Sequence, residues 1–136
     1  MERSIIQGTQ IFANKAVPAT KKDQQDIIDL RDTFIHNANR AAGLAANMIG
    51  SNKRIIVFGI NQIPVIMVNP KITSHSGSYQ ATEGCLSLQG ERSVTRYQEI
   101  TVNYLDENFK QQTGKFHGFV AEVIQHEIDH CEGKEI

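Results

Sequence analysis

The sequence predicts an α+β fold, in which antiparallel or mixed β-sheets pack around a C-terminal helix, with a further helix near the N-terminus. Three observations support this prediction. Apolar residues recur at helical spacing over residues 21–40, apolar and polar residues alternate over 96–106, and a second apolar run at helical spacing extends from Gly118 through Cys131. No linker separates these segments, so we expect one domain over residues 1–136.

The composition is that of an ordinary globular protein. Charged residues make up 21% of the 136 residues, and the formal net charge is −1. A charge this close to zero gives no sign of a nucleic-acid or membrane surface. No apolar stretch approaches the roughly 18 residues of a membrane-spanning helix, and no basic segment followed by an apolar run begins the chain. We therefore expect a soluble, cytoplasmic protein.

The first helix is predicted from about Lys21 to Arg40. Thr20 is suited to the N-cap position, and Asp23 three residues later completes a weak capping box. The stripe that would face the core follows helical spacing and consists of Ile27, Leu30, Phe34, Ala38 and Ala41. Before this helix, residues 4–17 show no clear period, and Pro18 indicates a break in structure.

The middle of the chain reads as several strands. Residues 54–60 are rich in β-forming residues, and a second apolar run covers residues 64–68. Residues 74–78 carry a glycine and several serines, so we interpret them as a loop. The alternation over 96–106 predicts a half-buried strand that turns at residues 106–108, with residues 112–116 returning as its partner.

The C-terminal helix carries the pattern His-Glu-x-x-His as His126, Glu127 and His130. Residues four apart lie on the same helix face, so the two imidazoles can bind one metal ion, and Glu127 beside them can act as a general base. The surrounding residues are apolar, which indicates a buried helix whose polar side chains need partners. Gly133 is typical of a helix C-cap. The sequence thus predicts a metal-binding helix.

A catalytic metal usually takes three protein ligands, and the residues alone leave the third one open. Cys131 follows His130 directly, so its side chain points about 100° away from that histidine and suits the core. His36, His75 and His117 fit surface positions. Cys85 lies in a glycine-containing segment read as a tight loop or strand edge, where a thiolate would be a strong soft ligand. In an intracellular chain such a role is favoured over a disulfide between the two cysteines.

Three segments together resemble the signature motifs of the peptide deformylases. They are Gly43-Leu44-Ala45-Ala46, Glu83-Gly84-Cys85-Leu86-Ser87 and Gln125-His126-Glu127-Ile128-Asp129-His130. Their order and spacing fit this family, and the resemblance runs from the first helix to the end of the chain. It implies an enzyme that removes the formyl group from the N-terminal formyl-methionine of nascent polypeptides.

The resemblance also implies roles at the reacting centre. Cys85, His126 and His130 would bind one divalent metal ion, commonly Fe²⁺ in the cell, with Zn²⁺, Ni²⁺ or Co²⁺ as substitutes. Glu127 would be the general acid and base, and the backbone N–H of Leu86 would help to hold the oxyanion. These roles agree with what metal-assisted hydrolysis requires.

The remaining roles concern the substrate. Gly43, Leu44 and Ala45 would form an edge for the substrate backbone, and Met48, Glu83 and Gly84 would complete the substrate-binding residues. Glu83 would pair with Arg92 or Arg96 in a structural or substrate-positioning role. The methionine side chain would enter an apolar pocket, which the helix face and the Ala45-Ala46 region help to line.

The sequence departs from the family pattern at two motif positions. Ala41 stands where the first motif normally begins with glycine, and Met48 stands where it ends with glutamine. That glutamine donates a hydrogen bond to the oxyanion, and a thioether cannot donate. Loss of one such donor typically costs about 10²–10³ in kcat. The N-terminal segment also lacks the usual Asp-Pro-x-Leu-Arg run, and only six residues follow His130, so a divergent member of the family is expected.

Three hypotheses follow. The first is a peptide deformylase whose activity is reduced by Met48. The second is a metal-binding protein that has lost catalysis and binds formyl-peptides or the ribosome. The third is a general metallopeptidase, which would need a further ligand downstream of the helix motif. Only Glu132 and Glu135 remain there as candidates, which disfavours the third hypothesis.

Overall fold

The computed structural model describes residues 1–136 and has the predicted α+β fold. Short 3₁₀ helices cover Gln10–Phe12, Lys21–Asp23 and Ala46–Ile49. The longer elements are the helices α1 (Gln24–His36) and α2 (Gly118–Cys131) and the strands β1 (Gly43–Ala45), β2 (Ile55–Ile60), β3 (Ile63–Cys85), β4 (Leu88–Leu105) and β5 (Gln111–His117).

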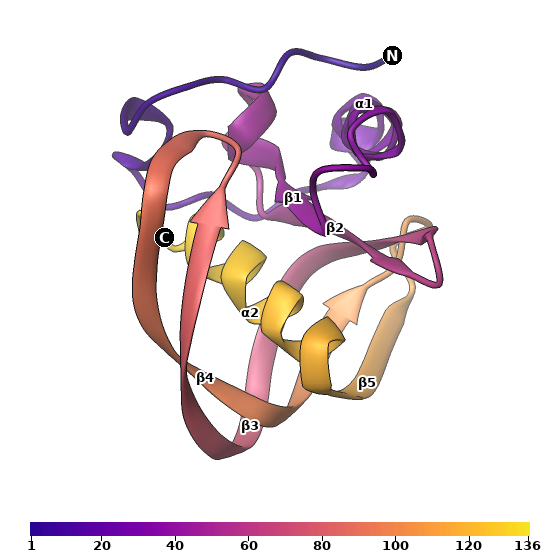
Figure 1. Cartoon of the computed structure of the whole chain (residues 1–136). Helices are drawn as coiled ribbons and strands as arrows, with labels where there is room; N and C mark the ends of the chain where they lie inside the picture. The colour runs from indigo at the N-terminus through magenta and orange to yellow at the C-terminus, as the bar shows by residue number, and fades with distance from the viewer.

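The five strands form one sheet in chain order, and every neighbouring pair is antiparallel. The only parallel pairing is an isolated bridge between Val17 and Lys53. Figure 1 shows the long ribbons of β3 and β4 curving around α2, while α1 lies beside β1 and β2 at the other end of the molecule. The sheet therefore packs around the C-terminal helix, as the sequence predicts.

A single apolar cluster of 23 buried residues joins both helices to the sheet. α2 contributes Ala121, Ile124 and Ile128 from one face, which agrees with the apolar stripe read from the sequence. α1 contributes Ile27, Leu30 and Phe34, and β2 contributes four consecutive residues, Ile55 to Phe58. Neither helix combines the length and apolar composition that crossing a bilayer would require.

The start of the first helix is as predicted, but its end is not. The Thr20 side chain accepts a hydrogen bond from the Lys22 amide, and the Asp23 carboxylate accepts one from the Thr20 amide. The first turn is 3₁₀, and α1 ends at His36 instead of continuing to Arg40. The Asn37 side chain donates to the Thr33 carbonyl, and asparagine competes in this way with helical hydrogen bonding.

The predicted loop over residues 74–78 is wrong, because these residues lie in the middle of β3. Their partners are on β4, with Ser74 opposite Thr101 and Ser78 opposite Tyr97. The segment is exposed, so its serines face water while the backbone is satisfied by the neighbouring strand. The polar composition of residues 74–78 reflects their exposure to water and does not indicate the end of a strand. The predicted strand over 96–106 is correspondingly the second half of a longer one, β4.

Two turns end the longest strands. Leu86 and Ser87 connect β3 to β4, so the glycine-containing segment that the sequence indicates to be a tight loop or strand edge is a strand end followed by a two-residue turn. The predicted turn after β4 is present, and the Asp106 carboxylate accepts hydrogen bonds from the amides of Asn108 and Lys110. The first of these turns places Cys85 against α2.

Candidate active site

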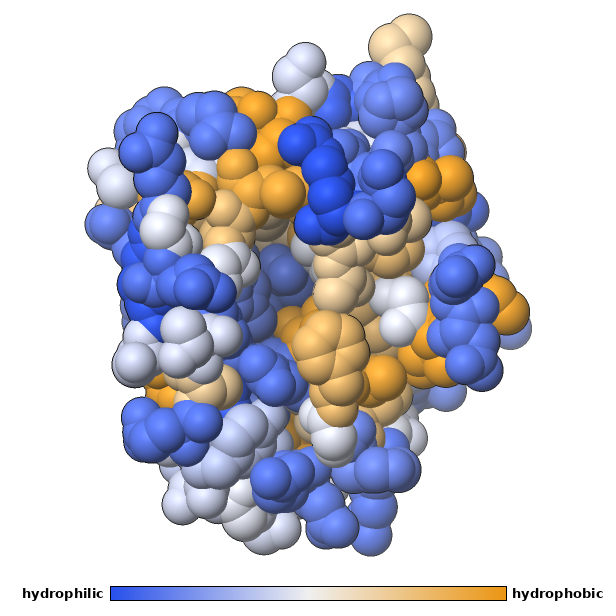
Figure 2. Space-filling view, viewed as in Figure 1, coloured by the Kyte–Doolittle hydropathy of each residue, from blue (hydrophilic) through white to orange (hydrophobic).

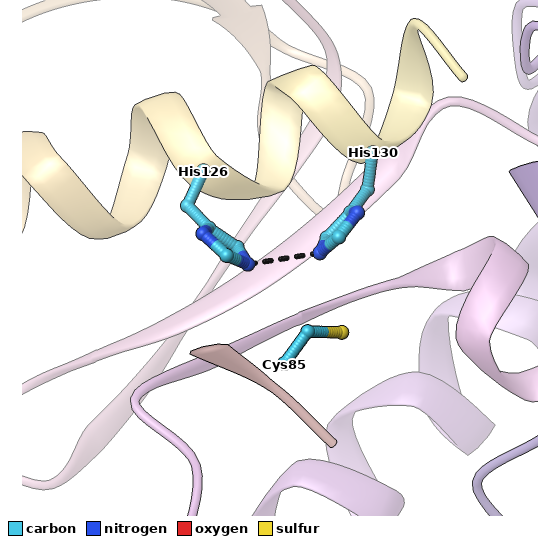
Figure 3. Close-up of side chains that lie close together, drawn as sticks. All are labelled: Cys85, His126 and His130. Carbon is cyan, nitrogen blue, oxygen red and sulfur yellow. Dashed lines mark hydrogen bonds between the residues drawn. The ribbon is translucent and has the colours of Figure 1, made fainter. Parts of the chain in front are cut away.

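Two elements bring together three side chains that can bind a metal ion. His126 and His130 project from the same side of α2, one turn apart, and Cys85 approaches them from the end of β3 (Figure 3). The ligand atoms of these three residues all lie within 4.8 Å of one another. His130 is fully buried and His126 nearly so, whereas Cys85 is partly exposed.

The two imidazoles face each other through Nε2 atoms that are 2.9 Å apart. Hydrogen bonds with Cys85 and Glu83 raise the pKa of His126 to about 10, although burial alone would lower it. Burial and the neighbouring His126 charge lower the pKa of His130 to about 3. Two unprotonated nitrogens cannot face each other this closely without a cation between them, so the pair fits either one shared proton or a metal ion. A thiolate completes a donor set suited to a divalent metal.

A buried carboxylate orients the first histidine. The Glu83 Oε1 atom lies 2.8 Å from His126 Nδ1, and both Glu83 oxygens accept hydrogen bonds from Arg96. Arg96 in turn donates to Asp129 on α2 at 2.6 Å. Burial opposes ionisation of Glu83, but the bonds with His126 and Arg96 hold its pKa at about 2. Glu83 therefore fixes both the orientation and the tautomer of His126.

The second histidine is held by the backbone and by an aromatic ring. His130 Nδ1 lies 3.2 Å from the Lys134 carbonyl, so the other ring nitrogen is the one free to bind a metal. The Phe12 ring stacks on the imidazole with centroids 4.7 Å apart. The Asn47 amide donates to the His130 carbonyl. A metal-binding histidine normally donates its second ring nitrogen to a partner of the kind that the Lys134 carbonyl provides here.

Glu127 lies between the two histidines in sequence and is almost fully buried. Its Oε1 atom has no hydrogen-bond partner in the protein, and burial raises its pKa to about 7. Gly43 on β1 packs directly against it: a Cβ atom there would lie 3.2 Å from Glu127 Cγ and 2.8 Å from Val123 Cγ1. A buried carboxyl with an unused oxygen can exchange protons with a molecule in the cleft.

These groups open into a cleft of about 430 Å³. Figure 2 shows a hollow in the middle of this face, with hydrophilic atoms inside it and hydrophobic atoms on its rim. Several predicted site residues line the cleft: Gly43, Met48, Glu83, Gly84, Cys85, Leu86, His126 and Glu127. Leu44 and Ala45 do not line it, because their side chains are fully buried in the core. Their strand, β1, is the first in the sheet order and has one unpaired edge.

The side chain of Met48 is buried and lines the cleft, and its sulfur accepts a hydrogen bond from the Ala45 amide at 3.5 Å. Met48 therefore lies in the cleft but offers no hydrogen-bond donor there. Ala45 and Ala46, which the sequence suggested as walls of an apolar pocket, are both completely buried and lie outside the cleft lining. Phe119, Glu122 and Val123 of α2 line it instead.

The other candidates lie elsewhere. Cys131 is buried in the core, which raises the pKa of its thiol to about 12, and both cysteines are free. His36 is at the exposed end of α1, and His75 stacks on Tyr97 in the sheet. His117 is the residue before α2. Arg92 donates to the Gln89 carbonyl, so Arg96 is the arginine that pairs with Glu83.

Sequence reasoning assigned no role to three residues that support the site. Gln125 pairs its side-chain amide with both backbone groups of Tyr97 and so fastens α2 to β4. Gln7 donates to the Leu86 carbonyl at 2.7 Å and so ties the N-terminal segment to the Cys85 turn. Phe12 lies in a segment without periodicity. Only Gln125, an amide on a buried helix, carried a signal that could have been used.

The comparisons with known proteins agree with this geometry. A family model described as polypeptide deformylase matches residues 4–136. A peptide deformylase of Clostridium beijerinckii is 45% identical over 133 residues, which cover 98% of each chain. Peptide deformylase 3 of Shewanella oneidensis is 40% identical over 112 residues, covering 79% of this chain and 68% of that one.

Solved structures give the same result. A peptide deformylase from Legionella pneumophila superposes with a TM-score of 0.87 at 34% identity, covering 98% of this chain and 83% of that one. A peptide deformylase from Thermotoga maritima gives 0.87 at 28% identity, with coverages of 98% and 93%. The fold and the Cys-His-His cluster define a metallohydrolase. More particularly, the chain belongs to the polypeptide deformylase family and is a peptide deformylase, whose substrates are formylated nascent peptides.

Proposed function

We propose that this protein hydrolyses the formyl group of N-formylmethionyl peptides with one divalent metal ion held by Cys85, His126 and His130. The single observation that carries the proposal is the convergence of these three side chains beside the unpartnered oxygen of Glu127, in an open cleft. Such a metal supplies Lewis acidity and lowers the pKa of water toward neutrality. Fe²⁺ is the proposed ion in the cell, and Zn²⁺, Ni²⁺ or Co²⁺ suit the same donors.

The protein's own residues perform the remaining steps. The substrate backbone pairs with the unpaired edge of β1 at Gly43, which places the formyl carbon beside the ligand cluster. Glu127 accepts a proton from the attacking water through its free oxygen and passes it to the leaving amine. The backbone N–H of Leu86, in the turn that carries Cys85, donates to the developing oxyanion. Glu83 keeps His126 aligned throughout.

Met48 favours a second candidate function, that of a deformylase-fold protein with impaired catalysis that binds formyl-peptides or the ribosome. Its thioether lines the cleft and offers no hydrogen-bond donor. We rank this second, because the residues proposed to move protons and to bind metal are all present. Under either proposal the protein works where nascent chains emerge, in the cytoplasm.

Formate release from a formyl-methionyl tripeptide tests the proposal. Protein loaded with Fe²⁺ or Ni²⁺ and kept from oxygen should turn over, and metal-free protein should not. Glu127→Gln should abolish turnover while metal stays bound, because the amide cannot accept and pass on the proton. Unchanged turnover in that variant would contradict the role of Glu127. Metal-loaded protein that binds the peptide without releasing formate would favour the second candidate.

A further inference from the structure

Part of the N-terminal segment is tied to the turn that carries Cys85. The Gln7 side chain donates to the Leu86 carbonyl at 2.7 Å, and the Gly8 amide donates to the Ser87 carbonyl at 2.8 Å. Figure 1 shows the indigo N-terminal segment passing beside the turn between β3 and β4. Gln7 is exposed and does not line the cleft. The segment therefore reaches the site from outside, through the backbone of the turn.

This turn differs from the other two-residue connection in the sheet. Asn61 and Gln62 join β2 to β3, and both have positive φ, as two-residue hairpins favour. Leu86 and Ser87 join β3 to β4, and neither has positive φ. The strand register also shifts between the last two residues of β3. A connection with these backbone angles does not follow the twist of its strands, so contacts from outside the hairpin help to fix its shape.

One peptide unit links Gln7 to the proposed ligand. Its carbonyl, on Leu86, accepts from Gln7, and its N–H, on Ser87, donates to Cys85 Sγ at 3.4 Å. A peptide unit is planar and trans, so its C=O and N–H point in opposite directions. Holding the oxygen toward Gln7 therefore directs the N–H toward the sulfur. The two hydrogen bonds also polarise the same amide, so each strengthens the other.

The bond from Ser87 gives the thiol an outer partner. Both histidines of the cluster have such a partner on the ring nitrogen that faces away from the other histidine, and partners of this kind orient the ligands of a metal. A hydrogen bond to a ligand sulfur withdraws electron density from the sulfur and favours the thiolate. Gln7 thus acts on Cys85 through the backbone, without entering the cleft.

We propose that Gln7 is a positioning residue of the metal site, whose bond to the Leu86 carbonyl holds the Ser87 N–H on the Cys85 thiolate and so strengthens metal binding. This inference rests on the proposed function, because it takes Cys85 as a metal ligand. Loss of an outer partner typically weakens metal binding by about 10–100-fold. Gln7 acts one peptide unit further out, so we expect the lower end of that range, about tenfold.

The test replaces Gln7 by a side chain of the same length that cannot donate. Gln7→Met should bind Co²⁺ about tenfold more weakly in a competition titration with a chromogenic chelator. The thiolate-to-Co²⁺ charge-transfer absorption should move to lower energy, because the sulfur loses a hydrogen bond. Gln80→Met is the matched control on β3, where an exposed glutamine donates to Thr95 Oγ1 at 2.8 Å. Its affinity and absorption should equal those of the wild type.

Gln7→Lys keeps a donor of similar reach and should return both readouts to the wild-type values. Equal losses in Gln7→Met and Gln7→Lys would overturn the inference, as would equal losses in Gln7→Met and Gln80→Met. The metal-free variants should melt with the wild type, because Gln7 is exposed. A lower melting temperature of Gln7→Met with unchanged affinity and absorption would assign Gln7 a structural role alone and overturn the inference.

Co²⁺ binding needs no turnover, so the two proposals can fail separately. If no form of the protein releases formate but Gln7→Met weakens Co²⁺ binding and shifts the absorption, the proposed function fails and the role of Gln7 stands. In an active enzyme Gln7→Met should lower kcat and leave KM unchanged, because Gln7 lies outside the cleft lining. If the wild type releases formate and Gln7→Met equals it in affinity, absorption and kcat, the proposed function stands and this inference fails.

Discussion

Glu83 holds His126 from the side opposite the nitrogen that faces His130: its Oε1 atom is 2.8 Å from His126 Nδ1 and 2.7 Å from Arg96 Nη2. Since Arg96 also binds Asp129 on α2, the carboxylate is locked between the helix that carries the histidines and the strand that faces it. The orientation of His126, one of the three proposed metal ligands, thus depends on a buried network of charges. Within this network only Glu83 contacts His126.

Glu83→Gln should weaken metal binding by about 10–100-fold, the usual effect of removing an outer-shell partner. The amide can still reach His126, but it carries no charge to balance Arg96. It also does not increase the basicity of the imidazole as a metal ligand, as a carboxylate does. A competition titration with a chromogenic chelator measures the affinity. Glu99→Gln, an exposed change on β4, is the matched control and should bind metal as the wild type does. Equal affinity in both variants would contradict the role of Glu83.

Gly43→Ala should destabilise the protein and displace Glu127. The added methyl would sit 2.8 Å from Val123 and 2.9 Å from the Val57 carbonyl, and overpacking of this kind costs about 1–3 kcal/mol. Thermal unfolding measures the loss. Gly84→Ala is the control, because its Cβ atom would make an ordinary contact at 3.5 Å, and it should be neutral or slightly stabilising. Similar melting temperatures for both variants would show that β1 can move away from α2.

Local periodicity was sufficient to predict the two helices and the pairing of the histidines, because both follow from spacing within one element. Cys85 could not be assigned in this way. It lies at the end of a different element, and only the antiparallel turn at Leu86 and Ser87 brings it to α2. The family resemblance supplied that contact, which local patterns do not contain.

Other features depended on tertiary context. Residues 74–78 look like a loop by composition, but pairing with β4 makes them a strand. Leu44 and Ala45 belong to the motif that the sequence predicts to bind the substrate backbone, yet their side chains fill the core, so only their backbone is available to a substrate. Glu122 reads as an ordinary polar helix residue, and its place in the cleft wall depends on how α2 sits in the sheet. In each case the structure or the environment of the residues depends on distant parts of the chain.

The two cysteines should react very differently. Cys85 is partly exposed in the cleft, whereas Cys131 is 1% exposed and burial raises its pKa to about 12. A thiol reagent should therefore label one cysteine of the native metal-free protein quickly and the second only in denaturant. Bound metal should protect the fast thiol, and Cys85→Ser should remove it. Two thiols of equal reactivity in the native protein would show that the α2 core opens readily.

Acid should loosen the turn between β4 and β5. Hydrogen bonds from the Lys110 and Asn108 amides, in that order, lower the pKa of Asp106 below its ordinary value of 3.8. Because the pKa is lowered in the folded state, the stabilisation is complete above 3.8 and is lost as the pH falls through the lowered pKa. Asp106→Asn should reduce stability slightly at pH 7 and flatten the acid limb of a urea-midpoint profile. Glu91→Gln should leave the profile as it is. An unchanged profile in Asp106→Asn would show that the hydrogen bonds of this turn do not contribute to the acid dependence of stability.

Met48→Gln tests how much activity the missing donor costs. A glutamine at this cleft position could donate to the oxyanion, and one such donor is typically worth about 10²–10³ in kcat. We expect kcat to rise by tenfold or more, with little change in KM, because the new bond forms chiefly in the transition state. Met48→Leu, which keeps the volume and adds no donor, should not raise kcat. A rise in both variants would attribute the effect to loss of the sulfur contact with the Ala45 amide. No rise in Met48→Gln would mean that Leu86 and the metal already stabilise the oxyanion.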